Sequence, residues 1–207
     1  MWVAAAVVAL GLALGIGWLA WPDAAPYSPP GVAKAAPVVP TQRPSTLPKP
    51  TCATVAHDFV PRKIAVAGVT KGASVVTPPR EANGVPGAPP LTTRGKSVFA
   101  WDKQQGILPG DAAGNVLLNA HTWPDGSALG NRLLASLRKG DRIVVMGANA
   151  RLCYRVTERI EVPVKPGLLR YYTTDGPPQL AIVVCSGRRL GSGEWTKRTV
   201  WFASPAV

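Results

Sequence analysis

The chain has 207 residues, 46% of them hydrophobic, which is enough for one globular domain with additional segments. It carries 23 Lys and Arg against 11 Asp and Glu, a formal net charge of +12. These basic residues accompany neither a helix-turn-helix pattern nor the signatures of RNA-binding domains, so we expect no nucleic-acid partner. The charge fits either plain solubility or attraction to an anionic polymer or lipid headgroup of the cell envelope.

The first predicted element is a membrane anchor. Residues from Trp2 to Trp21 include no charged side chain and are mostly Ala, Val, Leu, Ile and Gly. As a helix rising about 1.5 Å per residue, this segment spans roughly 30 Å, the hydrocarbon thickness of a bilayer. We expect residues 1–21 to be a single-pass transmembrane anchor at the cell membrane, with the rest of the chain extracytoplasmic. The alternative is a signal peptide, although no basic residue precedes the segment.

A proline-rich linker follows at residues 22–51. Nine prolines lie between Pro22 and Pro50, and large apolar side chains are few. Such a segment cannot bury a core and is expected to be an extended, semi-rigid spacer. Residues 52–207 then remain as the catalytic or binding domain, long enough for one hydrophobic core.

This domain is predicted to be all-β. Short apolar segments alternate with turns that contain Pro and Gly, and Arg80–Pro90 is a loop rich in both residues. Only Ala128–Arg138 has leucines at the three- and four-residue spacing of a helix. About eight short strands with one brief helix indicate a β-barrel or sandwich. The expected strands are Lys63–Val69, Val75–Val76, Ser97–Trp101, Val116–Thr122, Arg142–Gly147, Leu152–Val164, Gln179–Ser186 and Thr199–Ala203.

A candidate nucleophile ends one of these strands. Cys185 follows the apolar run Leu180–Val184 and precedes the polar residues Ser186–Arg189, so we expect the strand to leave the core at the cysteine. A lone cysteine in such a place is most often a small core side chain. The alternative is a reactive thiol at the rim of the domain, which needs a base or a nearby cation to become a thiolate.

The sequence offers a base and a cation at similar positions. His121 ends the apolar run Val116–Ala120 and a loop follows it, whereas His57 lies near the linker and outside any strong strand. We therefore prefer His121 as the base, against the ordinary alternative of a structural histidine. Arg198 opens the last strand, where a guanidinium can present a fixed cation to an oxyanion, although charge alone does not separate it from other basic residues nearby.

The other two cysteines leave two alternatives open. Cys52 and Cys153 form a disulfide, which an extracytoplasmic domain permits, or they are two ordinary buried thiols. Cys185 is then the unpaired one of the three. No set of Cys and His has the spacing of a metal site and no acidic cluster suggests calcium, so we expect neither metal nor cofactor.

Several of these stretches resemble the sortase family. Ala181–Cys185 is similar to the family's apolar strand that ends in cysteine, and Glu194–Arg198 to its last strand, with a Trp before the Arg. The resemblance covers roughly residues 58–205 and keeps the order His, Cys, Arg. The composition, rich in Ala, Pro, Gly and Val, suits the actinobacterial class E/F sortases. The stretches that resemble the family's His segment and the helix and strand after it are Asn119–Trp123, Ala128–Gly130 and Gly140–Val145.

The resemblance implies a fold and a reaction. The fold is an eight-stranded β-barrel with one or two short helices, and the reaction is that of a membrane-anchored cysteine transpeptidase. Cys185 would attack the Thr–Gly carbonyl of a Leu-Pro-x-Thr-Gly (LPxTG) sorting signal and form a thioester. Arg198 would stabilise the oxyanion, and His121 would transfer protons. An amine of a cell-wall precursor, of the lipid II kind, would then resolve the thioester.

The resemblance also implies a substrate groove and exposes one departure from the family. The Leu-Pro part of the signal lies beside the connection between the sixth and seventh strands, here about Lys165–Pro178. Val184 stands where family members usually carry Thr, which bears on substrate positioning. The expected groove residues are Val184, Leu168, Leu169, Tyr171 and Tyr172.

Three alternatives stay open. An L,D-transpeptidase is also a Cys/His enzyme of the envelope, but its Ser-x-Gly-Cys motif is absent. A sortase-like domain that binds envelope polymer or partner proteins without catalysis fits the basic charge and Val184. A pilin-polymerising sortase would use a lysine amine as its acceptor. The chain holds no LPxTG of its own, since Leu47–Pro50 lacks the Thr-Gly, so we expect the enzyme rather than its anchored substrate.

Overall fold

The computed structural model describes Cys52 and residues 57–206. The expected anchor at residues 1–21 and the expected linker at residues 22–51 lie outside these described residues. Within the described part of the chain, no helix combines the length and the apolar character needed to cross a membrane.

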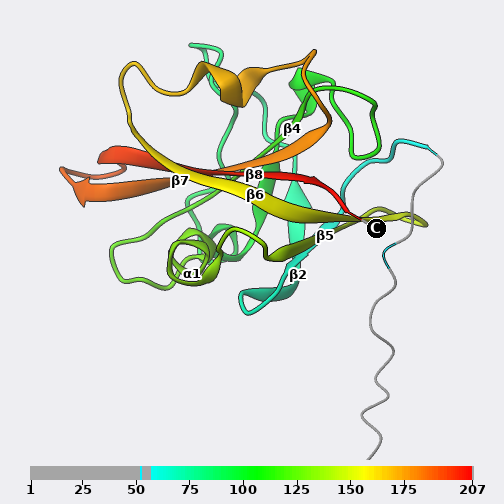
Figure 1. Cartoon of the computed structure of the whole chain (residues 1–207). Helices are drawn as coiled ribbons and strands as arrows, with labels where there is room; N and C mark the ends of the chain where they lie inside the picture. The colour runs from blue at the N-terminus through cyan, green and yellow to red at the C-terminus, as the bar shows by residue number, and fades with distance from the viewer. Residues whose placement is uncertain (1–51, 53–56, 207) are drawn as a thin grey trace, which may run out of the picture. The chain divides into compact units, whose positions relative to one another are not determined.

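Eight strands close into one barrel, which confirms the expected all-β fold (Figure 1). Hydrogen-bonded neighbours follow the order β1-β2-β3-β4-β7-β8-β6-β5, and β5 pairs with β1 to close the ring. The β2–β3 and β4–β7 pairs are parallel, and the other neighbours are antiparallel. The strands are β1 (Lys63–Val66), β2 (Thr70–Val76), β3 (Phe99–Trp101), β4 (Asn115–Ala120), β5 (Arg142–Met146), β6 (Arg151–Pro163), β7 (Gln179–Arg189) and β8 (Trp195–Pro205).

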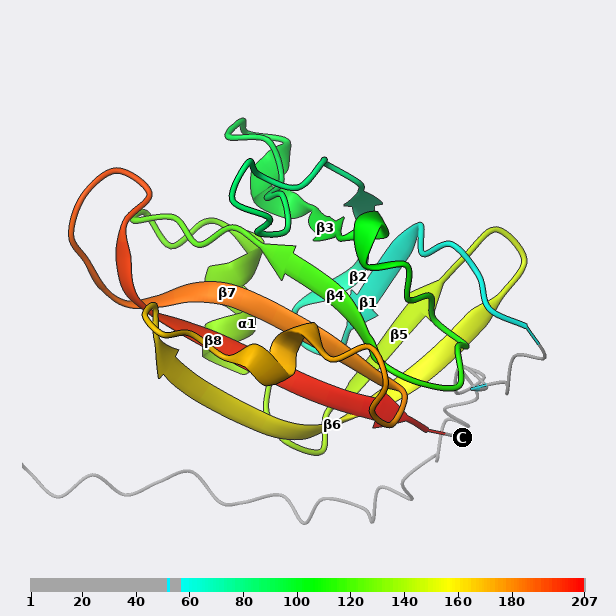
Figure 2. The same ribbon diagram turned by 90° about the horizontal axis from the view of Figure 1, so that it is seen from above.

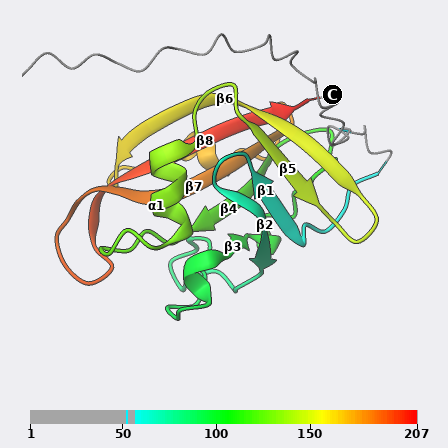
Figure 3. The same ribbon diagram turned by 90° about the horizontal axis from the view of Figure 1, so that it is seen from below.

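One α-helix, α1 (Leu129–Ser136), forms where the leucine spacing predicts it and lies beside β7 (Figure 3). Leu129 and Leu133 on this helix, with Leu137 just after it, are fully buried in the cluster that fills the barrel. The indole nitrogen of Trp201 donates a hydrogen bond to the Leu137 carbonyl at 3.1 Å, which fixes the end of α1 to β8. Three short 3-10 helices in the described residues are η1 (Gly95–Ser97), η2 (Lys103–Gln105) and η3 (Leu169–Tyr172).

β4 and most of β7 are buried on both faces, which explains their largely apolar sequences. On β7, Leu180 and Ile182 point into the barrel, whereas Ala181 and Val183 belong to a second apolar cluster on the outside. Tyr171 of η3 covers that outer cluster. Figure 2 shows the connection between β6 and β7, which contains η3, lying across β7 and β8. Because side chains alternate along a strand, Cys185 falls on the outer face with Val183.

Several strands extend further than the sequence predicts. β2 begins at Thr70 rather than Val75, because Thr70–Ser74 also pairs with β1. The sequence did not indicate this part of the strand, since Lys71–Ser74 holds few apolar residues. β7 continues to Arg189, three residues beyond the expected end at Ser186. Its last residues are exposed but still pair with β8, so the chain leaves the core without leaving the sheet.

A disulfide joins Cys52 to Cys153 with a Cα–Cα distance of 5.4 Å, which decides between the two alternatives for these cysteines. Cys153 is fully buried on β6. The bond therefore ties the beginning of the described chain to the barrel across 101 residues.

Candidate active site

His121, Cys185 and Arg198 line one pocket, with a volume of about 410 Å³. β4 and β7 run parallel with Ala120 beside Val184, so the residues that follow, His121 and Cys185, lie at the same end of the barrel. On the other side of β7, β8 places Arg198 directly opposite Cys185. Three adjacent strands thus bring together a thiol, an imidazole and a guanidinium that are far apart in the sequence.

Cys185 is the free cysteine of the three, and it is half-buried. Burial raises the pKa of its thiol, and the Arg198 guanidinium opposes this shift only in part. The resting side chain is therefore a protonated thiol at neutral pH. Its reaction with an electrophile requires that a base accept the proton.

His121 is held by a loop from elsewhere in the chain. Its Nε2 donates a hydrogen bond to the Pro89 carbonyl at 2.5 Å. A carbonyl oxygen only accepts hydrogen bonds, so Nε2 carries a proton in this contact. The neutral ring in this tautomer has Nδ1 as its base.

The backbone around His121 fits closely against α1 and β7. The Gly130 N–H donates to the His121 carbonyl at 2.8 Å, and a Cβ at Gly130 would lie 2.4 Å from that oxygen. The Thr122 hydroxyl donates to the Cys185 carbonyl at 2.7 Å, so the loop after β4 is bonded directly to the strand of the thiol. Only a glycine permits the approach at position 130.

The rest of this loop is braced from two sides. Asn131 of α1 both accepts from the Trp123 N–H at 2.9 Å and donates to the Trp123 carbonyl at 3.0 Å. Lys96 lies 4.0 Å from the Trp123 ring centroid and pairs with Asp125 at 2.9 Å. The hydrogen bonds from Ser127 and the nearby Lys96 ammonium hold the pKa of Asp125 well below its usual range. The histidine loop is therefore a fixed structure.

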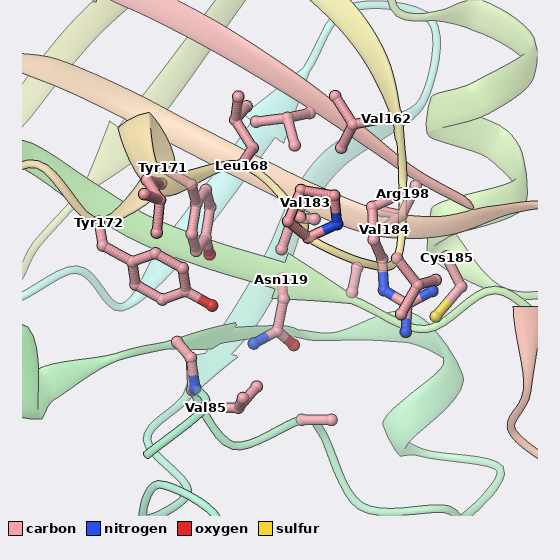
Figure 4. A pocket seen from close by; sticks show the side chains of 18 of the residues that line it. Val85, Asn119, Val162, Leu168, Tyr171, Tyr172, Val183, Val184, Cys185 and Arg198 are labelled. Atoms are coloured by element: carbon pink, nitrogen blue, oxygen red, sulfur yellow. The ribbon is translucent and has the colours of Figure 1, made fainter. Parts of the chain in front are cut away.

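Arg198 is half-buried, and one of its terminal nitrogens donates to the Lys197 carbonyl at 2.9 Å. The guanidinium has five N–H groups, so donors remain for a ligand in the pocket. Figure 4 shows the Arg198 and Cys185 side chains on the same side of the pocket, across from Asn119 and Tyr172. A carbonyl oxygen that becomes negative beside Cys185 would meet this cation.

The pocket lies between two walls. One wall is the loop between β2 and β3, which contributes Val85, Pro86 and Ala88. The other is the β6–β7 connection with η3. Apolar side chains dominate the lining, and they suit an apolar peptide segment.

The five expected groove residues all border this pocket, but their side chains differ in what they contact. Tyr171 is only 4% exposed, and its hydroxyl donates to the Leu118 carbonyl at 3.1 Å, so it supports the floor of the groove. Leu169, 86% exposed, and Tyr172, 40% exposed, form the open rim, and Leu168 packs on the outer cluster. The Val184 side chain is 2% exposed and belongs to the barrel interior. Burial raises the pKa of both tyrosines.

Sequence reasoning missed the β2–β3 wall and Asn119. Asn119 lines the pocket two residues before His121, and its amide nitrogen donates to the Gly87 carbonyl at 2.9 Å. A polar residue inside the apolar run Val116–Ala120 is the signal that could have indicated it. The wall gave no such signal, because it accepts hydrogen bonds from Asn119 and His121 through backbone carbonyls, which every residue has.

Two other sequence expectations concern His57 and metal sites. His57 is exposed and does not line the pocket. Within Cys52 and residues 57–206, no three His, Cys, Asp or Glu side chains gather in a way that could hold a metal ion.

Solved structures of several sortases match this fold. Sortase A of Listeria monocytogenes matches with a TM-score of 0.51 and 20% identity, over 72% of this chain and 89% of that one. A pilus-related sortase C of Group B Streptococcus matches with a TM-score of 0.54 and 14% identity, over 74% and 69%. Sortase C1 of Streptococcus agalactiae, in a complex with MTSET, gives 0.53 and 12%, over 70% and 68%.

Comparison by sequence adds nothing to these matches: no protein-family model and no curated protein matches this chain. At identities of 12–20%, the structural matches show a shared fold. The eight-stranded barrel of this protein is therefore a sortase fold.

Proposed function

We propose that this protein is a sortase-type cysteine transpeptidase that cleaves LPxTG-type sorting signals between Thr and Gly. The observation that carries the proposal is the pairing of the free Cys185 with Arg198, in an apolar pocket that also contains His121. Each side chain supplies one requirement of acyl transfer: a nucleophile, a cation for the oxyanion and a proton carrier. The composition, rich in Ala, Pro, Gly and Val, supports an actinobacterial, class E/F-like member.

The first half-reaction forms the thioester. Since burial raises its pKa, the Cys185 thiol gives up its proton to His121 as sulfur attacks the Thr carbonyl carbon. The carbonyl oxygen becomes negative and is stabilised by Arg198. When the C–N bond breaks, His121 returns the proton to the leaving glycine amine. The acyl group remains on Cys185.

The second half-reaction transfers the acyl group. An acceptor amine attacks the thioester and loses its proton to His121, and a new amide bond forms. The Cys185 thiolate leaves and takes that proton back, so the enzyme is restored. We propose that the acceptor is an amine of a cell-wall precursor of the lipid II kind, which attaches the sorted protein to the wall.

The groove accounts for the apolar part of the signal. Leu168 and Val183 offer an apolar surface in the pocket that contains the thiol, and Val85 faces them from the opposite wall. A Leu-Pro segment buries its side chains there at about 25 cal/mol per Å² of apolar area removed from water. Since the pocket is open at its rim, an extended peptide can enter with its Thr beside Cys185.

We also propose that the domain works outside the cytoplasm, held at the cell membrane by residues 1–21. The apolar sequence of this segment supports an anchor. The Cys52–Cys153 disulfide supports an oxidising compartment, because cytosolic thiols are kept reduced. Labelling of Cys185 by a membrane-impermeant maleimide in intact cells tests this placement; protection until lysis would contradict it.

The experiment that tests the reaction compares the full chain with its Cys185→Ala variant on a quenched fluorescent LPxTG peptide. We expect cleavage by the wild type alone, and faster cleavage when a small amine such as hydroxylamine or triglycine is added. A scrambled peptide of the same composition controls for sequence. A wild type that binds the peptide without cleaving it would replace the enzyme with a non-catalytic envelope-binding domain.

A further inference from the structure

The loop between β2 and β3 holds two groove-facing side chains of the β4 segment through two of its own carbonyls. We call residues Arg80–Pro90 the strap. The Gly87 carbonyl accepts from Asn119, and the Pro89 carbonyl accepts from His121. The two accepting residues, Gly87 and Pro89, are two positions apart, and so are the two donating residues, Asn119 and His121. This spacing is that of two neighbouring strands, except that side chains are the donors. The strap thus runs alongside the end of β4 in register.

The strap is rigid for reasons visible in its sequence and packing. Pro86, Gly87 and Pro89 are buried although they belong to a connecting loop. A Cβ at Gly87 would lie 2.1 Å from the Pro79 carbonyl oxygen, so the chain folds back tightly on itself there. Prolines restrict the backbone further, which lowers the entropy lost on fixing the loop.

Arg80 anchors the start of the strap to the barrel. Its Nε and one terminal nitrogen both donate to the Oδ2 of Asp102, at 2.9 and 2.6 Å, and Nε also contacts the other carboxylate oxygen at 3.2 Å. The Asp102 side chain is 2% exposed. The backbone N–H of Asp102 donates a hydrogen bond to the Leu117 carbonyl of β4. The Arg80 N–H also donates to the Gln104 side chain at 2.8 Å. A forked contact of this kind fixes direction as well as distance.

The same guanidinium reaches the opposite wall of the pocket. Its terminal nitrogen donates to the Gln105 side-chain oxygen at 2.8 Å, and the Gln105 amide donates to the Tyr172 carbonyl at 2.9 Å. Tyr172 belongs to η3 and lines the pocket. The half-buried Arg80 therefore links the wall that holds His121, through Gln105, to the wall that would hold the substrate.

We propose that Arg80 is the positioning residue of this site: it anchors the strap, whose Pro89 carbonyl keeps the proton on Nε2 of His121 and leaves Nδ1 to exchange protons with Cys185 and the amines. Through its hydrogen bond to Gln105, Arg80 also positions the wall that contains η3. The catalytic part of this inference rests on the proposed function; the hydrogen bond between His121 and the strap does not.

The first test observes the histidine directly by NMR. The chain has two histidines, so His57→Gln leaves His121 as the single imidazole of the full chain. With 15N-labelled histidine we expect a resolved Nε2–H proton signal that is protected from exchange with solvent. Arg80→Gln should abolish this signal, and Arg94→Gln should keep it. Arg94 is an exposed residue on the same β2–β3 connection, which makes it a matched control.

The second test measures kinetics on the LPxTG peptide. Since small misplacements of a catalytic group are costly, Arg80→Gln should lower kcat by about 10-fold or more and raise KM, because both walls shift. Arg80→Lys keeps the charge but loses the fork, so its kcat should be intermediate. Arg94→Gln should stay within about twofold of the wild type, as surface substitutions usually do.

The outcomes separate the two claims. A wild type without the protected Nε2–H signal overturns the inference, whether or not Arg80→Gln folds. Equal kinetics for folded Arg80→Gln and Arg94→Gln overturn the role of Arg80. A protected signal that depends on Arg80 in a chain that cleaves no peptide supports the strap contact and sinks the proposed function instead.

Discussion

Cys185 and Arg198 are direct cross-strand partners on β7 and β8, with Val184 opposite Thr199 on one side and Ser186 opposite Lys197 on the other. Partners in an antiparallel pair project from the same face of the sheet. The cation is therefore placed beside the thiol by the backbone hydrogen bonds of two long strands rather than by a loop. The thiol experiences two opposing effects there: burial raises its pKa and Arg198 lowers it.

This balance predicts the pH dependence of thiol alkylation. Because the pKa of Cys185 is raised, its reaction with iodoacetamide should keep accelerating above the ordinary thiol pKa of about 8.5. Arg198→Gln removes the favourable charge, so the midpoint should move to still higher pH. Mass spectrometry of the alkylated chain gives the rates. Arg188→Gln, at an exposed position further along β7, is the control and should not shift the midpoint; a midpoint lowered by Arg198→Gln would contradict the account.

The glycine beside the histidine loop predicts a second result. In an ordinary helix Gly→Ala stabilises by about 1 kcal/mol. At Gly130, however, the new Cβ would meet the His121 carbonyl oxygen at 2.4 Å and the Thr122 hydroxyl at 2.7 Å, so the loop must move. We expect Gly130→Ala to lower kcat for peptide cleavage by roughly 10- to 100-fold. Gly72→Ala, whose Cβ has no neighbour closer than 3.9 Å, serves as the control. Unchanged kinetics in Gly130→Ala would show that the loop position does not matter.

The departure from the sortase pattern at Val184 predicts a small effect. Val184 borders the pocket, but its side chain is buried in the barrel interior, and its partner Thr199 has a buried hydroxyl without a hydrogen-bond partner among the described residues. A threonine at 184 can pair with that hydroxyl, which offsets the cost of burying it. Val184→Thr should therefore change kcat/KM by less than about threefold and the free energy of unfolding by less than about 1 kcal/mol. A large gain in activity would mean that position 184 governs the groove.

The disulfide predicts a measurable loss of stability on reduction. Cys52 and Cys153 are 101 residues apart, and closing a loop of this length contributes up to about 4.7 kcal/mol in the chain-entropy model. Urea unfolding should show that Cys52→Ser loses about 2–5 kcal/mol and no longer responds to reductant. Cys185→Ser should unfold like the wild type and keep its response. Equal stability with and without reductant in the wild type would be the contrary result.

The barrel could be predicted from its short apolar segments, and the three chemical groups because each lies at the end or the beginning of an apolar run. Leu180–Val184 is a continuous apolar run and Val116–Ala120 is interrupted only by Asn119, since both faces of β4 and β7 are covered. The β2 strand was largely missed because its first residues are mostly polar and only Ala73 among them is buried.

The strap was beyond sequence reasoning for a different reason. Arg80–Pro90 has no periodicity, and its contribution comes from the carbonyls of Gly87 and Pro89. Only the three-dimensional fold shows that Asp102 lies opposite Arg80. Likewise, the sequence named Tyr171 and Leu169 together as groove residues, although one is buried and the other is almost fully exposed.

The most direct test of the central claim is the mass of the protein after it has reacted with an LPxTG peptide. The account predicts an adduct on Cys185 equal to the peptide through its Thr, released by hydroxylamine as the hydroxamate and absent in Cys185→Ala. Arg198→Gln should slow its formation by about 10²- to 10³-fold, the usual effect of losing an oxyanion donor. Cleavage that proceeds equally in Cys185→Ala, or a wild type that forms no adduct and leaves the peptide intact, would contradict the assignment of Cys185 as the nucleophile.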